Sequence, residues 1–178
     1  QMSEVSTNYY TWGLDLSGLN SSLNDRGAAG GIGGLLAIED VDPGTQQTGS
    51  FLYFYDANGN IGQVLGTATG SVAVKYEYDP YGNRTNTPTQ GEFDQPFRFS
   101  TKYFDAETRL YDFGRRLLIP RIGRWTNRDP IGERGGNNLL TYVANQPLSR
   151  TDALGLSASH SDCERAIRTA LANNKKAK

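Results

Sequence analysis

The densest turn-forming run of this chain lies between residues 109 and 156. It contains three short segments, RLYDFGRR (109–116), GRWTNRDPIG (123–132) and PLSRTDALGL (147–156). The last two segments each hold an Asp followed three positions later by a Gly, Asp129 with Gly132 and Asp152 with Gly155. An Asp side chain can accept a hydrogen bond from the backbone two residues on, and Gly tolerates a positive φ. The run therefore predicts tight chain reversals.

The composition of the whole chain agrees with many turns. Its 178 residues include 21 Gly and 7 Pro, and Asn-Gly and Asp-Pro pairs recur. Such punctuation favours short strands over long helices. With 37% hydrophobic residues, ten Tyr and seven Phe, the chain can bury a core of ordinary domain size. We therefore expect a mainly β fold, an antiparallel ribbon that runs into a compact core with irregular turns.

An internal repeat supports this expectation. The sequence YDANGN at 55–60 recurs as YDPYGN at 78–83, and a degenerate copy starts at Phe104. Each copy joins an aromatic strand end to an Asp and a Gly with the spacing of a hairpin turn. The residues 71–78 between them alternate apolar and polar side chains, as a strand does. Two such units make a short ribbon whose edges need partners.

Two more segments have strand-like patterns. The Gly-rich stretch 27–34 precedes the apolar residues 35–38, and it lacks the Gly-Lys-Ser/Thr of a phosphate-binding loop. We expect a turn and then a short buried strand. Residues 97–104 alternate aromatic and polar side chains. This pattern predicts a strand with its aromatic side chains on one face and with Arg98 and Lys102 in solvent, rather than a platform for single-stranded nucleic acid.

The overall charge excludes some partners. The net charge of −1 gives no electrostatic footprint for nucleic acid or an anionic membrane. No apolar run approaches the roughly 20 residues that span a bilayer. The first residues, QMSE, lack the basic and apolar regions of a signal peptide, so we expect none in this chain.

Asp129 and Asp152 are the candidates for chemistry. If residues 139–143 form a strand and 145–147 its return, the two carboxyl groups approach each other. Two close carboxylates cannot both ionise cheaply, so one keeps a proton, and the pair can activate water and protonate a leaving amide nitrogen. The alternative is that both are turn residues whose side chains cap local backbone amides.

The C-terminal segment 157–178 changes character. Ser161 and Glu164 have the spacing of a capping box before an apolar-periodic stretch, which predicts a short helix. Twenty-two residues cannot build a core, so no toxin activity can be assigned to this segment. The single His160 and single Cys163 both lie here, which leaves metal binding and Cys-His catalysis without support, and we expect no cofactor.

Together, the repeats and the 109–156 run resemble RHS/YD-repeat proteins, and the run resembles the RHS-repeat-associated core of that family. The resemblance implies YD repeats that wind into a hollow β-shell, and a core that plugs the shell and cuts the chain after an Asp-x-x-Gly-Leu motif. It divides the chain into an incomplete β segment (1–50), two YD repeats (51–90), the core (91–156) and a variable tail, a toxin stub (157–178).

For the site, the resemblance implies an aspartic autoprotease with Asp129 and Asp152 as catalytic residues and Arg128 as a neighbour that keeps one carboxylate ionised. The cleavage site would be Gly155, Leu156 and Ser157, with the bond after Leu156 cut. The motif departs from the family pattern at one position, where Ala153 stands in place of Pro.

The resemblance also implies partners and a location. The partners would be the rest of an RHS β-shell and its C-terminal cargo, within a secreted bacterial polymorphic toxin or a cell-surface protein. The alternative function is that of a non-catalytic RHS fragment, a structural or interaction module that can associate with itself through its strand edges.

Overall fold

A computed structural model describes residues 7–15, 31–41, 48–88, 93, 95–156 and 159–160. Within these residues the regular structure is strands and short 3-10 turns, which confirms the mainly β prediction. The predicted helix after Ser161 lies outside the described residues, as do Ser157 and Cys163. None of the described helices is long and apolar enough to cross a membrane.

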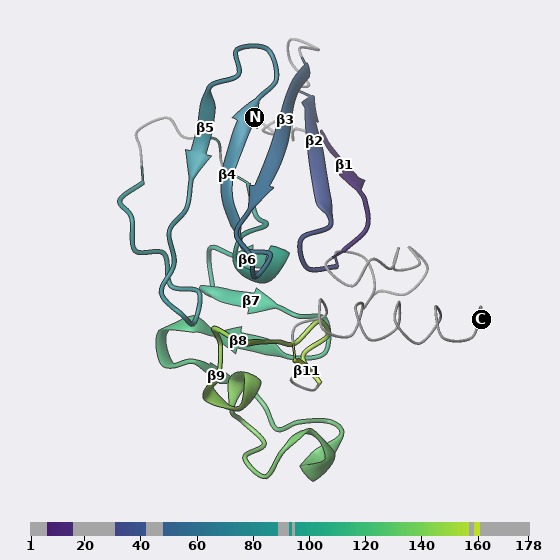
Figure 1. The fold of residues 1–178 in the computed structure, drawn as a ribbon, viewed down its shortest axis with the longest axis vertical. Coiled ribbons are helices and arrows are strands. Elements are labelled where there is room, and N and C mark those ends of the chain that lie inside the picture. The colour runs from purple at the N-terminus through teal and green to yellow at the C-terminus, as the bar shows by residue number, and fades with distance from the viewer. Residues whose placement is uncertain are drawn as a thin grey trace, which may run out of the picture.

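The first half of the chain forms one antiparallel sheet whose strand order follows the sequence. Each strand pairs with the next one along the chain, so the sheet is a simple meander (Figure 1). Its strands are β1 (Thr7–Trp12), β2 (Leu35–Val41), β3 (Thr48–Tyr55), β4 (Ile61–Gly66) and β5 (Val72–Lys75). The strands expected at 35–38 and 71–78 are thus confirmed as β2 and as the shorter β5.

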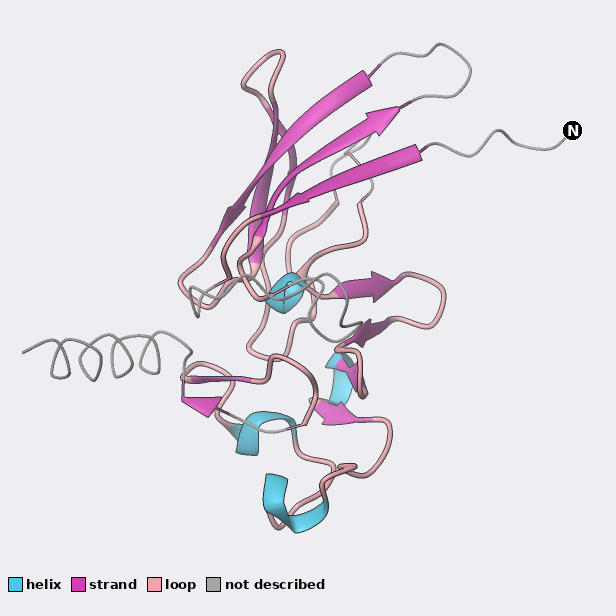
Figure 2. Cartoon of the chain, turned by 90° about the vertical axis from the view of Figure 1, so that its right-hand side faces the viewer, coloured by secondary structure: helices cyan, strands magenta, loops and turns pink. Residues whose placement is uncertain are grey.

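The second half forms a smaller four-stranded sheet below the first (Figure 1). Its strands cross the direction of the larger sheet and are joined by irregular turns (Figure 2). They are β6 (Tyr103–Asp105), β7 (Leu110–Asp112), β8 (Leu117–Ile119) and β9 (Arg124–Trp125). Near the chain end, β10 (Arg150–Thr151) pairs with β11 (Ser159–His160). Four 3-10 turns cover Phe99–Thr101, Pro120–Ile122, Gly132–Gly135 and Tyr142–Asn145.

Each sheet has its own buried core. The larger sheet buries one face, with a cluster that consists of Leu35, Ile38, Tyr53, Ile61, Val64, Val74 and Tyr76. The smaller sheet packs on a second cluster, which consists of Phe99, Tyr111, Phe113, Leu118, Trp125, Tyr142 and Val143. Tyr78 contacts both clusters and lies edge-on to Phe99 with ring centroids 5.9 Å apart. The aromatic residues therefore fill the cores, as the composition suggested, and Tyr78 joins the two cores.

The strand predicted over residues 97–104 is wrong except at its end, where Tyr103 and Phe104 belong to β6. Ser100 and Thr101 have positive φ angles of 51° and 54°, so the chain turns there. The cause is the first repeat turn: the Ser100 amide donates to Asn60 Oδ1 (2.8 Å) and Thr101 Oγ1 donates to the Gly59 carbonyl (2.8 Å). The turn also reverses the prediction for Lys102, which is only 7% exposed instead of lying in solvent.

The strand predicted over residues 139–143 is also wrong. This segment forms turns, and its one backbone bridge joins Thr141 to Arg124. Tyr142 and Val143 are almost fully buried, and Val143 takes a positive φ of 40°. Tyr142 packs against Trp125 in the aromatic core, with ring centroids 5.3 Å apart, so this segment turns into the core instead of extending as a strand.

Candidate active site

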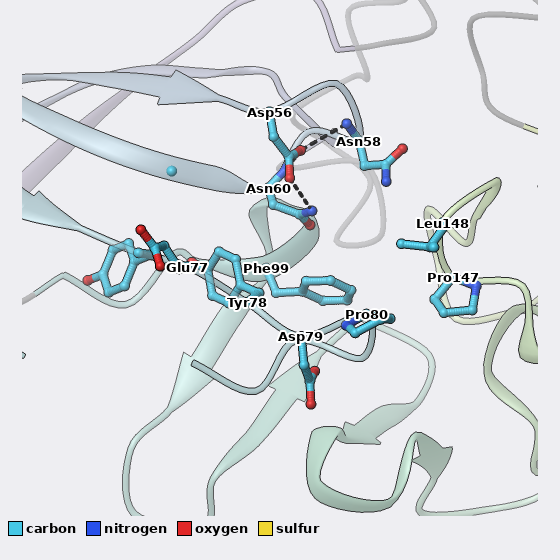
Figure 3. Close-up of a pocket in the computed structure, with 12 residues that line it drawn as sticks. Asp56, Asn58, Asn60, Glu77, Tyr78, Asp79, Pro80, Phe99, Pro147 and Leu148 are labelled. Atoms are coloured by element: carbon cyan, nitrogen blue, oxygen red, sulfur yellow. Dashed lines mark hydrogen bonds between the residues drawn. The ribbon is translucent and has the colours of Figure 1, made fainter. Parts of the chain in front are cut away.

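The site is built from one type of turn, which the repeats show most clearly. Asp56 Oδ1 accepts hydrogen bonds from the amides of Asn58 (2.8 Å) and Asn60 (3.0 Å), and Oδ2 accepts from Asn60 Nδ2 at 2.7 Å (Figure 3). In the second repeat, Asp79 makes the same set of bonds to the two residues at the matching positions, Tyr81 and Asn83. In both repeats the aspartate is therefore satisfied by its own turn.

The turns at Asp129 and Asp152 share with the repeats the Oδ1 contact to the amide two residues on, and Asp152 also shares the contact four residues on. Asp129 Oδ1 accepts from the Ile131 amide at 3.0 Å. Asp152 Oδ1 accepts from the amides of Leu154 (3.2 Å), Gly155 (2.8 Å) and Leu156 (3.0 Å). The interpretation of both residues as turn caps is therefore correct for one oxygen of each carboxylate.

The other carboxylate oxygen is where the turns differ. Four residues after the Asp, the repeats have Asn60 and Asn83, whose side-chain amides occupy Oδ2. The same position holds Glu133 after Asp129 and Leu156 after Asp152, and neither side chain carries an amide donor. The Oδ2 atoms of these two turns therefore need a donor from elsewhere in the fold.

Arg116 supplies that donor to Asp129 and lies close to Asp152 as a cation. Its Nη2 lies 2.9 Å from Asp129 Oδ2 and 3.6 Å from Asp152 Oδ2. Both carboxylate oxygens are therefore close to the same nitrogen atom. The three side chains are 2%, 4% and 3% exposed, in the order Arg116, Asp129, Asp152. The approach of the two carboxyl groups predicted from the sequence is thus present, and the cation between them is Arg116.

Several contacts fix Arg116 in this place. It follows a turn in which the Gly114 amide donates to Asp112 Oδ1 at 2.6 Å. Its guanidinium carbon lies 4.3 Å from the centre of the Trp125 ring, a cation–π contact. Its Nη1 donates to the Leu139 carbonyl at 3.3 Å. A guanidinium held on so many sides is preorganised to bind carboxylates.

The predicted neighbour Arg128 is exposed on the surface. The sequence indicated Arg128 because it precedes Asp129 directly, but adjacency in the sequence does not decide whether a side chain is buried: Thr151, which precedes Asp152, is buried. The sequence did not single out Arg116, although the Arg115-Arg116 pair lies within the turn-rich run 109–116. The structure exposes Arg115 and buries Arg116.

The electrostatics of the cluster are those of two buried carboxylates beside two cations. Arg116 lies between the carboxylates, and the buried Lys102 ammonium group also interacts with Asp152. Burial raises the pKa of Asp152 above its ordinary value, against the opposing effects of the Leu156 amide and Arg116. Burial thus lets Asp152 keep its proton to a higher pH than a free aspartate does.

The residues before the predicted cleavage site lie against this cluster. Arg116 Nε donates to the Gly155 carbonyl, the Arg115 amide donates to the Leu154 carbonyl (3.2 Å), and Lys102 Nζ donates to the Ala153 carbonyl (2.8 Å). Gly155 has a φ of 72°, and a Cβ atom at this position would lie 3.2 Å from the backbone nitrogen of Arg116. Segment 153–156 is therefore held by hydrogen bonds to the carbonyl groups of residues 153–155 and by the hydrogen bonds from the amides of residues 154–156 to Asp152.

Two cavities in the described part of the chain lie away from this cluster. One cavity of about 350 Å³ lies between the two repeat turns and reaches Pro147 and Leu148 (Figure 3). Another, of about 720 Å³, lies beside Arg84 and Arg98. Neither is lined by Asp129 or Asp152. Among the described residues, no group of three or more His, Cys, Asp or Glu side chains is placed to hold a metal ion.

Fold and site together define a class of protein: a turn-linked antiparallel β protein whose buried carboxylate pair faces a segment of its own chain. The double-stranded DNA deaminase toxin A of Burkholderia cenocepacia is 34% identical over 128 residues, which are 70% of this chain and 9% of that toxin. The tRNA nuclease WapA of Bacillus subtilis is 33% identical over 110 residues, 59% of this chain and 5% of the nuclease. Toxin subunit YenC2 of Yersinia entomophaga is 38% identical over 90 residues, 49% of this chain and 9% of the subunit.

Solved structures agree with these relatives. The crystal structure of TcdB2-TccC3 without its hypervariable C-terminal region matches 67% of this chain with a TM-score of 0.60 and 29% identity, over 6% of its own length. The Tc holotoxin pore of Photorhabdus luminescens matches 69% with a TM-score of 0.58 and 28% identity, also over 6% of its own length. No protein-family model matches the chain. These similarities confirm the relationship to RHS-repeat toxins that the sequence predicts, and the chain spans a small part of each of these relatives.

Proposed function

We propose that this chain is the plug and self-processing segment of a larger RHS-type toxin, and that Asp129 and Asp152 hydrolyse the peptide bond between Leu156 and Ser157 of the same chain. The observation that carries the proposal is the placement of Arg116. It lies between the two buried carboxylates and also binds the Gly155 carbonyl, one peptide bond before the proposed cut.

The division of labour follows from the two environments. Asp129 has the shorter contact to Arg116, so it acts as the base that accepts a proton from water while the water oxygen bonds to the Leu156 carbonyl carbon. Asp152, whose pKa burial raises, holds a proton and transfers it to the Ser157 nitrogen as the C–N bond breaks. One water is consumed, and the products are a carboxyl group at Leu156 and an amine at Ser157.

The burial of the pair supports cleavage of its own chain rather than of outside proteins. Both carboxylate side chains are less than 5% exposed, and neither cavity described above leads to them. A free protease needs a cleft that admits its substrate. Segment 153–156 is already bound beside Asp152, so binding adds no entropic cost at the moment of reaction.

The test is the intact mass of the purified chain, wild type beside Asp129→Asn and Asp152→Asn. The proposal expects loss of the 157–178 peptide in the wild type and a full-length mass in both variants. Asp56→Asn is the matched control because it changes the same turn type outside the site, and it should be cut like the wild type. Equal masses for the wild type and the two site variants would refute the proposal.

A purely structural or interaction module is the second candidate. β1 and β5 end the five-stranded sheet, and Leu52 and Phe54 are 44% and 47% exposed on the face opposite the buried Tyr53. Open edges and an apolar face suit strands that continue into a larger β-shell or pair with a second copy. The rest of the shell and its C-terminal cargo are the proposed partners, in a secreted or surface-exposed protein. Sedimentation of Phe54→Lys against the wild type tests this candidate, which requires association that the substitution weakens.

A further inference from the structure

Lys102 is a buried cation that the mechanism above does not use. It follows the 3-10 turn Phe99–Thr101 and is 7% exposed. Its Nζ donates to the Ala153 carbonyl at 2.8 Å and lies 5.5 Å from the centre of the Phe113 ring. Lysine is almost never buried to this extent without a specific partner, so its position requires an explanation.

The electrostatic surroundings of Lys102 connect it to the site. Burial lowers the pKa of Lys102 from 10.5 to about 8, while Asp152, Asp112 and Asp15 act in the opposite direction, with Asp152 the strongest of the three. The ammonium group is thus retained at neutral pH at the cost of desolvation. An apolar side chain of the same length would avoid that cost, which points to a role for the contact with Ala153.

The hydrogen bond from Lys102 constrains the backbone at Ala153, directly before the segment that faces Asp152 and Arg116. Asp152 binds the amides of Leu154, Gly155 and Leu156. The Arg115 amide donates to the Leu154 carbonyl, and Arg116 Nε donates to the Gly155 carbonyl. Ala153 has no ring to fix its φ, in contrast to Pro. The Lys102 hydrogen bond is the contact that fixes the carbonyl of Ala153.

We infer that Lys102 is a positioning residue, which reaches across from a different part of the fold and holds the Ala153 carbonyl so that residues 154–156 stay in place against Asp152 and Arg116. The inference rests on the proposed cleavage for its functional meaning. Its structural content, an ordered 153–156 segment that depends on Lys102, is independent of cleavage.

The experiment compares Lys102→Met, Lys102→Arg and Lys75→Met with the wild type. Lys75 is the matched control because its side chain is 55% exposed and pairs with Glu77. We expect cleavage in Lys102→Met to slow by at least about tenfold, which corresponds to about 1.4 kcal/mol of activation free energy. Lys102→Arg keeps a donor and a charge and should restore the rate to within about threefold of wild type, equivalent to about 0.7 kcal/mol. Lys75→Met should cleave like the wild type.

Amide hydrogen exchange supplies a second readout, made on the Asp129→Asn background so that the chain stays whole and Asp152 keeps its contacts with the Gly155 and Leu156 amides. Lys102→Met should speed exchange at Gly155 and Leu156 relative to Lys102→Arg, with core amides such as Tyr111 unchanged. Unchanged exchange at these two amides would overturn the inference, whether or not the wild type cleaves. Wild-type cleavage in Lys102→Met together with loss of cleavage in Asp129→Asn would overturn the role of Lys102 alone and leave the proposed function standing.

Discussion

Replacing Arg116 with Met removes the cation that the two carboxylates share, while most of the side-chain volume stays against Trp125. Removing one partner of a buried ion pair typically costs about 3–5 kcal/mol because the remaining charge is uncompensated. Here all three side chains are at most 4% exposed, so solvent cannot compensate the change. The short 2.9 Å contact to Asp129 should dominate, since the 3.6 Å separation from Asp152 exceeds a hydrogen-bond length.

We therefore expect Arg116→Met to lower the free energy of unfolding by about 4 kcal/mol at pH 7. The loss should shrink in acid, because protonated Asp129 and Asp152 no longer repel each other when the cation is gone. The triple variant Arg116→Met, Asp129→Asn, Asp152→Asn should recover more than half of the loss. Arg115→Met is the matched control, because Arg115 is adjacent and exposed and uses its backbone amide for its contact with Leu154.

Urea unfolding followed by tryptophan fluorescence measures these differences, since Trp125 is buried beside Arg116. A stability loss of less than about 1 kcal/mol at pH 7, the usual size for a surface ion pair, would refute the account of Arg116 as the bridge. A loss that is the same at pH 5 and pH 7 would refute its electrostatic origin.

Three further predictions follow from the turns. Leu156→Asn places a side-chain amide where the repeats have Asn60 and Asn83, so it should occupy Asp152 Oδ2 and slow cleavage about tenfold or more, whereas Leu156→Met should not; mass spectrometry over time separates them. Gly155→Ala should lower stability by about 1–2 kcal/mol in urea unfolding because its φ is 72°; a loss near zero would contradict the structure there. Because the folded pKa of Asp152 is raised above 3.8, the folded state binds this proton more tightly than the unfolded chain. The stability contributed by this group is therefore present below the unfolded pKa and is lost as the pH rises through the folded pKa. Cleavage should slow over the same rise in pH, because Asp152 loses the proton that it donates. Urea unfolding of Asp152→Asn over a pH series should lack this loss of stability, because the variant lacks the titrating group.

The turns were the most predictable part of this protein. The Asp and Gly spacing in the repeats and in the 109–156 run is a local property, because the Asp side chain binds amides within its own turn. The sequence therefore indicated Asp129 and Asp152 and the chance that they meet. It also predicted two strands of the larger sheet, β2 and β5, although burial along β2 and β4 does not keep a strict period of two: Leu35 and Ile38 are both buried, as are Ile61 and Val64.

The partners of these carboxylates were not predictable in the same way. Which of several arginines turns inward depends on the bend after Gly114 and on the space beside Trp125, and both are set by tertiary packing. Lys102 was expected in solvent because strand alternation was assumed over residues 97–104. The positive φ angles of Ser100 and Thr101 rotate the chain and bring Lys102 inside, and they arise from contacts with a turn about 40 residues away in the sequence.

The measurement that tests the central claim most directly is the C-terminal sequence of any shortened product after incubation in isotopically labelled water. The account predicts a product that ends at Leu156, carries one labelled oxygen in its new carboxyl group, and is absent from the Asp129→Asn, Asp152→Asn double variant. A chain that stays whole, a cut at another bond, or the same product from the double variant would contradict it.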